Sequence, residues 1–344
     1  MNWADALVET LVDCGVEVCF ANPGTSEMQL VAAIDKQPKM RAILGLFEGV
    51  VTGAADGYGR MADKPAVTLL HLGPGLANGL ANLHNARRAR APVVNVVGDH
   101  ATNHLQYDAP LTSDVAGVAA PMSDWLRTSE SPLDLAVAGA QAVTAARSGQ
   151  GRIATLIAPA DHAWTEGAEP ATPTPGEGSP EASIESLNQS AEALRGNSQA
   201  ALFLGGRALR EDALEQAGRI AAATGARLIC ETFTARLQRG AGRVAIERLP
   251  YFGEMAAEFL DGLQHMVFVG AEPPVSFFAY PGKPSWLSPD DAQVIRLAGT
   301  RDNALQALRG VADTLEAPVT PAQVQEAFAP PFADGPLDPQ SLGA

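Results

Sequence analysis

Short, unbroken apolar stretches alternate with longer amphipathic stretches along the first half of the chain. Residues 66–72 (AVTLLHL) and 92–98 (PVVNVVG) are apolar almost throughout, and residues 75–90 between them have the spacing of a helix. Strands buried on both faces of a parallel sheet are apolar along their whole length, whereas half-exposed strands alternate. The pattern therefore predicts an α/β fold, in which helices cover both faces of a parallel sheet. Further helices are expected at 3–14, 26–36 and 49–62, and further strands at 41–47 and 152–159.

The same alternation resumes after residue 182 and predicts a second domain of this kind. A chain of 344 residues has room for two domains of roughly 100–200 residues. Between them, residues 166–181 hold four prolines and three glycines without periodicity, which is typical of a linker. We therefore expect two doubly wound parallel-sheet domains. Their expected bounds are 1–165 for the first domain, 166–182 for the linker, 183–312 for a Rossmann-like second domain and 313–344 for a tail.

Charge and cysteine content exclude several classes of protein. There are 39 Asp and Glu residues against 24 Lys and Arg, a net charge of −15, which disfavours binding to nucleic-acid phosphates. The three cysteines (Cys14, Cys19 and Cys230) form no CxxC pair, which favours a reducing cytoplasm over a disulfide framework. No apolar run has the length of a membrane span, and acids interrupt the first twenty residues, unlike a signal peptide. We expect a cytoplasmic protein that binds neither nucleic acid nor membrane.

One carboxylate, Glu48, is enclosed by apolar residues in the stretch LGLFEGVV. It is expected where a buried strand ends and a helix begins, and ligands of open α/β sheets bind at that edge. Apolar neighbours favour the protonated form of a carboxyl group, whereas a helix N-terminus favours the anion. A functional acid and an ordinary first-turn glutamate are both consistent with this position.

The stretch HLGPGLANGLANLHNARRA follows the 66–72 strand and combines close glycines with a polar helix face. Gly73 and Gly75 allow a close backbone approach, and the following helix offers free N–H groups. Three asparagines share one face of that helix, namely Asn78, Asn82 and Asn85. An uncharged polar face indicates a ligand or subunit contact, and a solvated face is the alternative.

The same glycines give a loose variant of a dinucleotide-binding fingerprint. Gly73, Gly75 and Gly79 follow a strand, and Asp99 ends the next strand. Pro74 lies between the first two glycines, and this is not the first strand–helix–strand unit of the domain, so the match is weak. A dinucleotide-binding oxidoreductase is therefore a minor alternative.

Histidines near the strand ends are further candidates. His71 ends the 66–72 strand, where a general acid or base would be well placed, although a histidine satisfied by backbone partners is the plainer interpretation. The loop after residue 98 carries a possible metal-ligand set, Asp99, His100, His104 and Asp108. Its polar composition favours a mobile loop over a metal site.

Taken together, these segments resemble the thiamine-diphosphate (ThDP) enzymes of the acetolactate synthase and benzoylformate decarboxylase group. The matching segments are ANPGTSE (21–27), LFEGVVTGAADGYGRMADKPAV (46–67), HLGPGLANGLANLHNARRARAPVVNVVGD (71–99) and DAPLTSDVAG (108–117). They cover most of the first domain at fixed spacing. The resemblance implies a pyrimidine-binding first domain and a Rossmann-like central domain, with the family's third, diphosphate-binding domain absent.

The resemblance also implies roles for particular residues. In this family the acid at the Glu48 position hydrogen-bonds N1′ of the cofactor's aminopyrimidine, and the shared proton activates the thiazolium for attack on a 2-keto acid. His71 matches a histidine of the benzoylformate decarboxylase branch, and is therefore a second catalytic candidate. The implied cofactor-binding residues are Pro23, Gly24, Thr25, Glu48, Gly73, Gly75 and Asn78.

Two departures concern the substrate. Asp99 stands where the family pattern has a glutamine, and Asp124 stands where a basic residue is expected. They leave open which keto acid is used, and whether the product is an aldehyde or a coupled hydroxyketone.

A further departure concerns the metal. The family holds Mg²⁺ and the diphosphate with a Gly-Asp-Gly start and a later asparagine, and no such unit occurs here, so no metal ligand is predicted in this chain. LDPQSL, with Asp338 as N-cap and Leu342 as the first buried position, looks like the opening of the third domain.

The leading hypothesis is the N-terminal part of a ThDP-dependent 2-keto acid decarboxylase or carboligase, a lyase or transferase resembling acetolactate synthase. We expect it to form a homodimer or homotetramer through its first domain and to be inactive as an isolated chain. Mg²⁺ and the diphosphate would be held by a partner chain or a missing segment, and FAD in the second domain is left open. A non-catalytic binding or assembly subunit that kept the fold is the main alternative.

Overall fold

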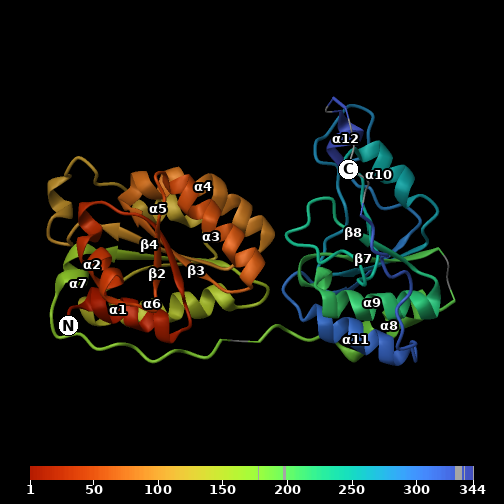
Figure 1. Cartoon of the computed structure of the whole chain (residues 1–344), viewed down its shortest axis with the longest axis horizontal. Coiled ribbons are helices and arrows are strands. Elements are labelled where there is room, and N and C mark those ends of the chain that lie inside the picture. The colour runs from red at the N-terminus through yellow and green to blue at the C-terminus, as the bar shows by residue number, and fades with distance from the viewer. Residues whose placement is uncertain (177, 197–198, 330–334, 337, 344) are drawn as a thin grey trace. The chain divides into compact units, whose positions relative to one another are not determined.

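The computed structural model describes residues 1–176, 178–196, 199–329, 335–336 and 338–343. The chain separates into two compact units, Met1–Pro180 and Glu181–Ala344. Each unit contains one sheet in which every strand pair is parallel, and helices pack on both faces, which confirms the predicted α/β class (Figure 1). Among the described residues, no helix is both long and apolar enough to cross a bilayer. Parts of the predicted linker, second domain and tail fall outside the described residues, at 177, 197–198, 330–334, 337 and 344.

The sheet of the first unit has the strand order β2-β1-β3-β4-β6-β5. Its strands are β1 (Val18–Asn22), β2 (Arg41–Leu44), β3 (Ala66–His71), β4 (Val93–Asp99), β5 (Trp125–Thr128) and β6 (Ile153–Pro159). Asn22 of β1 lies beside Leu70 of β3, and His71 lies beside Gly98 of β4. Because the strands are parallel, the residues that follow β1, β3 and β4 meet at one edge of the sheet.

Two apolar layers hold helices to the opposite faces of this sheet. The helices are α1 (Trp3–Asp13), α2 (Met28–Lys36), α3 (Glu48–Ala62), α4 (Leu72–Ala89), α5 (Val115–Ala119), α6 (Pro132–Arg147) and α7 (Ala160–Trp164), with short 3₁₀ turns η1 (Thr25–Glu27), η2 (Leu105–Tyr107) and η3 (Ala120–Met122). Val67 and Leu69 of β3 pack with α1, α2 and α6, whereas Ala66 and Leu70 pack with α3, α4 and α5. Successive strand side chains point to opposite faces, so a continuously apolar strand fills both layers.

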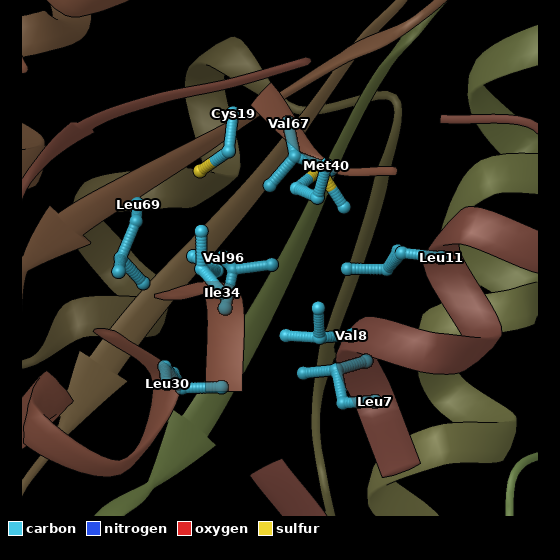
Figure 2. A pocket seen from close by; sticks show the side chains of 10 residues that line it. All are labelled: Leu7, Val8, Leu11, Cys19, Leu30, Ile34, Met40, Val67, Leu69 and Val96. Atoms are coloured by element: carbon cyan, nitrogen blue, oxygen red, sulfur yellow. The ribbon is translucent and has the colours of Figure 1, made fainter. Parts of the chain in front are cut away.

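The layer beneath α1 and α2 contains a small hollow (Figure 2). Side chains from both helices and from three central strands line it, namely Leu7, Val8, Leu11, Cys19, Leu30, Ile34, Met40, Val67, Leu69 and Val96. Its volume is about 10 Å³, close to the least that holds one water, and its lining is apolar. The hollow is therefore a packing gap of the core and does not resemble a ligand-binding site.

The strand before Glu48 differs from the prediction. β2 ends at Leu44, and it is the edge strand of the sheet, so it is largely exposed where a buried strand was expected. Leu46 is 90% exposed, and the side chains of Leu44, Phe47 and Val50 are also exposed. The apolar residues around Glu48 in the sequence therefore form a surface in this chain, and they do not enclose the acid.

The described residues of 166–179 contain no helix or long strand, and several of them are bonded to the first unit. Glu166 pairs with Asn2 in an isolated bridge, and its carboxylate lies 3.3 Å from the terminal ammonium of Met1. Further along, the backbone N–H of Ala171 donates to Oγ1 of Thr10 at 2.9 Å. The described residues of this segment therefore pack along the first unit.

The second unit repeats the layered arrangement around a sheet of order β11-β10-β7-β8-β9. Its elements are α8 (Ile184–Leu194), β7 (Ala200–Leu204), η4 (Gly206–Leu209), α9 (Glu211–Thr224), β8 (Arg227–Cys230), β9 (Glu247–Arg248), α10 (Gly253–Leu260), β10 (His265–Val269), β11 (Gln293–Ala298), α11 (Ala304–Thr314) and α12 (Pro339–Gly343). Leu202 and Leu204 of β7 face α8, α9 and α11, whereas Phe203 packs 5.1 Å from the ring of Phe268 on the side of α10.

The short helix α12 was predicted with one error. The Asp338 side chain accepts a hydrogen bond from the Ser341 N–H at 2.7 Å, as an N-cap does. Leu342, however, is 76% exposed, so it is not the buried position that was expected.

A buried polar ladder crosses the centre of the first sheet. Thr68, Asn95 and Thr155 lie side by side on β3, β4 and β6, and each is fully buried. Oγ1 of Thr68 donates to Oδ1 of Asn95 at 2.7 Å, and Nδ2 of Asn95 donates to Oγ1 of Thr155 at 3.1 Å. Buried polar groups are stable only when they are paired, so Asn95 satisfies both of its neighbours at once.

Substituting Asn95→Ala should leave the buried hydroxyl of Thr68 without its partner, whereas the hydroxyl of Thr155 keeps Oγ of Ser123 at 2.7 Å. We expect the free energy of unfolding to fall by about 1–3 kcal/mol, which is the cost of one unsatisfied buried group. Chemical denaturation followed by circular dichroism measures the change. Asn85→Ala on the exposed face of α4 is the matched control, expected within about 0.5 kcal/mol of the parent. Equal stability of the two variants would contradict the role assigned to the ladder.

Candidate active site

The carboxyl ends of β1 and β3 and the start of α3 bring several predicted site residues together. Glu48 begins α3, His71 ends β3, and Gly75 lies in the first turn of α4. Gly24 follows β1 and precedes η1. Neighbouring parallel strands end at the same edge of a sheet, so residues distant in sequence converge there.

One oxygen of the Glu48 carboxylate is bound by an asparagine, and the other is free to accept a hydrogen bond. Nδ2 of Asn78 donates to Oε2 of Glu48 at 3.0 Å. Within the described part of the chain, Oε1 accepts no hydrogen bond, and neither lysine nor arginine pairs with the carboxylate. A Cβ atom placed on Gly75 would lie 3.0 Å from Oε1, so the glycine keeps the space beside this oxygen open. The structure thus brings together Glu48, Gly75 and Asn78.

His71 is the second group at this edge, and it borders the same glycine. A Cβ atom on Gly75 would lie 3.3 Å from Cβ of His71. On its other side the imidazole packs so closely against Gly24 that any side chain there would overlap the ring. Gly24 and Gly75 therefore set the position of His71 through backbone contact, which explains why glycine stands at both positions.

The junction between His71 and α4 has an unusual backbone. Leu72 is fully buried and has φ of 51°, in the left-handed region that a branched residue seldom occupies. As a result α4 begins at residue 72, three residues earlier than predicted, and Gly73 and Gly75 lie inside its first turn. Such strain of about 1–3 kcal/mol persists where the surrounding packing imposes it, and it is concentrated at functional sites.

One further residue of this site was not predicted. Glu27 has a fully buried side chain, and its Oε2 lies 2.8 Å from Nδ1 of His71. The same oxygen accepts a hydrogen bond from the Gly24 N–H at 2.7 Å. Burial raises the pKa of Glu27, although the bonds from Gly24 and His71 act in the opposite direction. The available sequence signal was the spacing of Gly24 and Glu27, an acid three residues after a turn residue, as in a capping box.

The remaining predicted residues are placed less centrally. Thr25 is exposed at the start of η1, and Pro23 is half-buried between β1 and Gly24. Gly73 packs against the side chain of Ser113, on the side of the loop before α5. The role predicted for these three residues at the cofactor stays a prediction.

The asparagine face of α4 also contacts α3. Nδ2 of Asn82 donates to the carbonyl oxygen of Gly49 at 2.7 Å, while Asn78 reaches Glu48 as described. Asn85 lies 3.4 Å from Asn82 along the same face. Asn78 and Asn82 thus fasten α4 to the first turn of α3, and Asn78 remains exposed.

Neither the dinucleotide motif nor the metal cluster is supported by the geometry. Gly79 faces Thr52 of α3, where a Cβ atom would lie 2.7 Å from its methyl group, so the third glycine serves helix packing. In the loop after β4, His100 and His104 stack with ring centroids 5.7 Å apart. Burial raises the pKa of Asp99, whose carboxylate accepts the His100 backbone N–H at 2.8 Å. Among the described residues, no three His, Cys, Asp or Glu side chains converge as metal ligands.

The residues present fit one end of ThDP. A free carboxylate oxygen beside a glycine suits a ring nitrogen that shares a proton, and Glu48 with Gly75 supplies both. The described residues offer no comparable set for a metal-bound diphosphate. The site is thus suited to the aminopyrimidine of the cofactor.

Comparison with known proteins agrees with this assignment. Residues 1–119 match the family model described as "Thiamine pyrophosphate enzyme, N-terminal TPP binding domain". The chain is 54% identical over 337 residues to the "Putative acetolactate synthase large subunit IlvX" of Mycobacterium tuberculosis, covering 98% of this chain and 64% of that protein. It is 32% identical over 142 residues to the benzoylformate decarboxylase of Pseudomonas aeruginosa, covering 41% of this chain and 26% of that enzyme.

Solved structures share the fold at low sequence identity. The benzoylformate decarboxylase of Polynucleobacter necessarius superposes with a TM-score of 0.84 at 18% identity, over 99% of this chain and 66% of that one. The ThDP-dependent 4-hydroxybenzoylformate decarboxylase of Rhodococcus jostii gives 0.76 at 20% identity, over 97% and 65%. The chain therefore spans less than two thirds of the length of the relatives it matches. The sequence matches thus relate this chain to the thiamine-diphosphate-dependent enzymes, and residues 1–119 match the N-terminal binding domain of that family.

Proposed function

We propose that the chain provides the pyrimidine-binding and central parts of a ThDP-dependent 2-keto acid decarboxylase or carboligase. The observation that carries the proposal is the carboxylate of Glu48, with Oε2 held by Asn78 and Oε1 free beside Gly75. The names of its relatives, an acetolactate synthase large subunit and a benzoylformate decarboxylase, support the reaction class. In this proposal Glu48 is the residue that shares a proton with the aminopyrimidine.

The setting of Glu48 supports a fixed orientation of its carboxylate. Asn78 directs Oε2, and Asn82 holds the first turn of α3 through the carbonyl of Gly49. Oγ1 of Thr52 reaches across to the carbonyl of Gly79 at 2.9 Å and ties the two helices from the other side. A preorganised acceptor loses little conformational freedom when its ligand arrives, so the oxygen beside Gly75 stays available for a ring nitrogen.

His71 is proposed as the acid–base group that faces the substrate. Its Nδ1 is taken by Glu27, and no partner of Nε2 is found among the described residues. An imidazole with one nitrogen fixed and the other free can accept or donate a proton at the free nitrogen. When bound, the thiazolium of ThDP supplies the electron sink for the carbon–carbon bond that breaks.

The metal and diphosphate are proposed to be held outside this chain's own site. Mg²⁺ bound to phosphates needs carboxylate and carbonyl oxygens held together, and the described residues gather no such cluster. We therefore infer that a partner chain, or a segment beyond these residues, completes the site. On its own, the 344-residue chain should not turn over substrate.

We also propose that a second copy of the chain packs on the first unit. The side chains around Glu48 present an exposed apolar surface, made by Leu44, Leu46, Phe47 and Val50. Clustered apolar side chains of this kind mark interaction sites in proteins. A second copy bound to this surface would exclude water from the surface and from the adjacent Glu48.

Glu48→Gln is the most direct test of the catalytic proposal. In the assembled enzyme, we expect the exchange of the ThDP C2 proton with solvent to slow by at least about 100-fold, since a positioned acid–base group contributes about 10²–10⁴-fold. The rate is measured by ¹H NMR in D₂O after acid quenching. Glu215→Gln, at an exposed position of α9, is the control that should exchange at the parent rate. Exchange at the parent rate in Glu48→Gln would refute the assigned role.

Leu46→Glu tests the proposed self-association. The side chain is 90% exposed, so the charge should leave the fold intact while opposing burial against a second copy. Light scattering after size exclusion should find a dimer or tetramer for the parent and a shift toward monomer for the variant. Leu133→Glu, on α6 and 71% exposed, is the matched control that keeps the parent mass. A single mass shared by all three proteins would argue against this surface.

A further inference from the structure

Burying the carboxyl group of Glu27 in this site costs free energy. Its side chain is fully buried at the meeting point of β1, β3 and β4. Removing a carboxylate from water costs several kcal/mol unless partners replace the lost solvation. An apolar residue of similar size would fill this space without that cost, so packing alone does not account for an acid here.

A single carboxylate oxygen of Glu27 contacts both the loop after β1 and the end of β3. Oε2 accepts from the Gly24 N–H at 2.7 Å and lies 2.8 Å from Nδ1 of His71. Gly24 belongs to the loop after β1, and His71 ends β3. The carboxylate therefore fixes the imidazole from one edge, while the backbone of Gly24 packs on its face.

The other oxygen of Glu27 explains why the carboxylate stays in place. Oε1 is buried and finds no hydrogen-bond partner among the described residues. It lies against Gly98 at the end of β4, so closely that any side chain at position 98 would overlap it. Gly98 thus borders Oε1, while the Gly24 N–H and Nδ1 of His71 contact Oε2.

The contact with Glu27 bears on which nitrogen of His71 carries the proton. A carboxylate that accepts from Nδ1 keeps the proton there and leaves Nε2 with its lone pair. The imidazole side chain is 22% exposed, whereas that of Glu27 is fully buried. Nε2 is then the nitrogen that a bound substrate can meet.

We propose that Glu27 is a positioning residue for His71, holding the ring and its Nδ1–H tautomer so that Nε2 faces the reacting molecule. The inference rests on the proposed function, in which His71 acts as the acid–base group. Glu27 itself touches neither substrate nor cofactor in this account. Its contribution reaches the reaction only through the histidine.

The tautomer of His71 can be read without any activity measurement. Long-range ¹H–¹⁵N NMR of the imidazole groups at pH 8, with His71→Asn to assign the signals, distinguishes the two neutral forms. We expect Nδ1–H in the parent protein and in Glu27→Gln, because a carboxamide oxygen can still accept from Nδ1. Glu27→Leu removes the acceptor, so His71 should revert to the Nε2–H form that a free histidine side chain favours. An Nε2–H signal in the parent, or an Nδ1–H signal in Glu27→Leu, would overturn the proposal.

Kinetics of the assembled enzyme add a second readout. Glu27→Leu should lower kcat for a 2-keto acid by about 100-fold with little change in KM, and Glu27→Gln should restore most of the rate. Glu215→Leu on α9 is the control and should match the parent. Equal kcat in Glu27→Leu and the parent would refute the positioning role. Failure of the proposed function would appear separately, as unchanged C2 exchange in Glu48→Gln, while the NMR result would be unaffected.

Discussion

The close packing of α4 on α3 is the constraint on which the site depends. A Cβ atom placed on Gly53 would lie 3.0 Å from Nδ2 of Asn82. A Cβ atom placed on Gly79 would lie 2.7 Å from the methyl group of Thr52. Larger residues at these glycines would push the two helices apart. Because the helices approach so closely, Asn78 can reach Glu48 and Asn82 can reach the carbonyl of Gly49. The orientation of the proposed catalytic carboxylate is thus a consequence of how two helices pack.

A second constraint lies at the ends of three neighbouring strands. The buried carboxylate of Glu27 links the loop after β1 to His71, and Gly98 of β4 leaves room for it. Together with the left-handed backbone at Leu72, these contacts give the imidazole one orientation. The two candidate groups, Glu48 and His71, are therefore positioned by different elements, and both border Gly75.

Much of this architecture could be predicted from the sequence, because buried parallel strands have a distinct composition. The runs 66–72 and 92–98 correspond to β3 and β4 within one residue at each end. The prediction of a buried strand before Glu48 was wrong because β2 is an edge strand. An edge strand can carry apolar residues that its own chain leaves exposed, as at Leu44. Glu27 was missed because nothing local indicates burial. Its partners, His71 and Gly98, are 44 and 71 residues away, and only the fold brings them together.

The central claim is that Oε1 of Glu48 meets the pyrimidine ring of ThDP. A crystal structure of the assembled enzyme with ThDP and Mg²⁺ tests it most directly. The account predicts N1′ within about 2.6–3.2 Å of Oε1, with Asn78 still bound to Oε2. A cofactor bound elsewhere, or a Glu48 side chain turned into solvent while the ring is in place, would contradict the account.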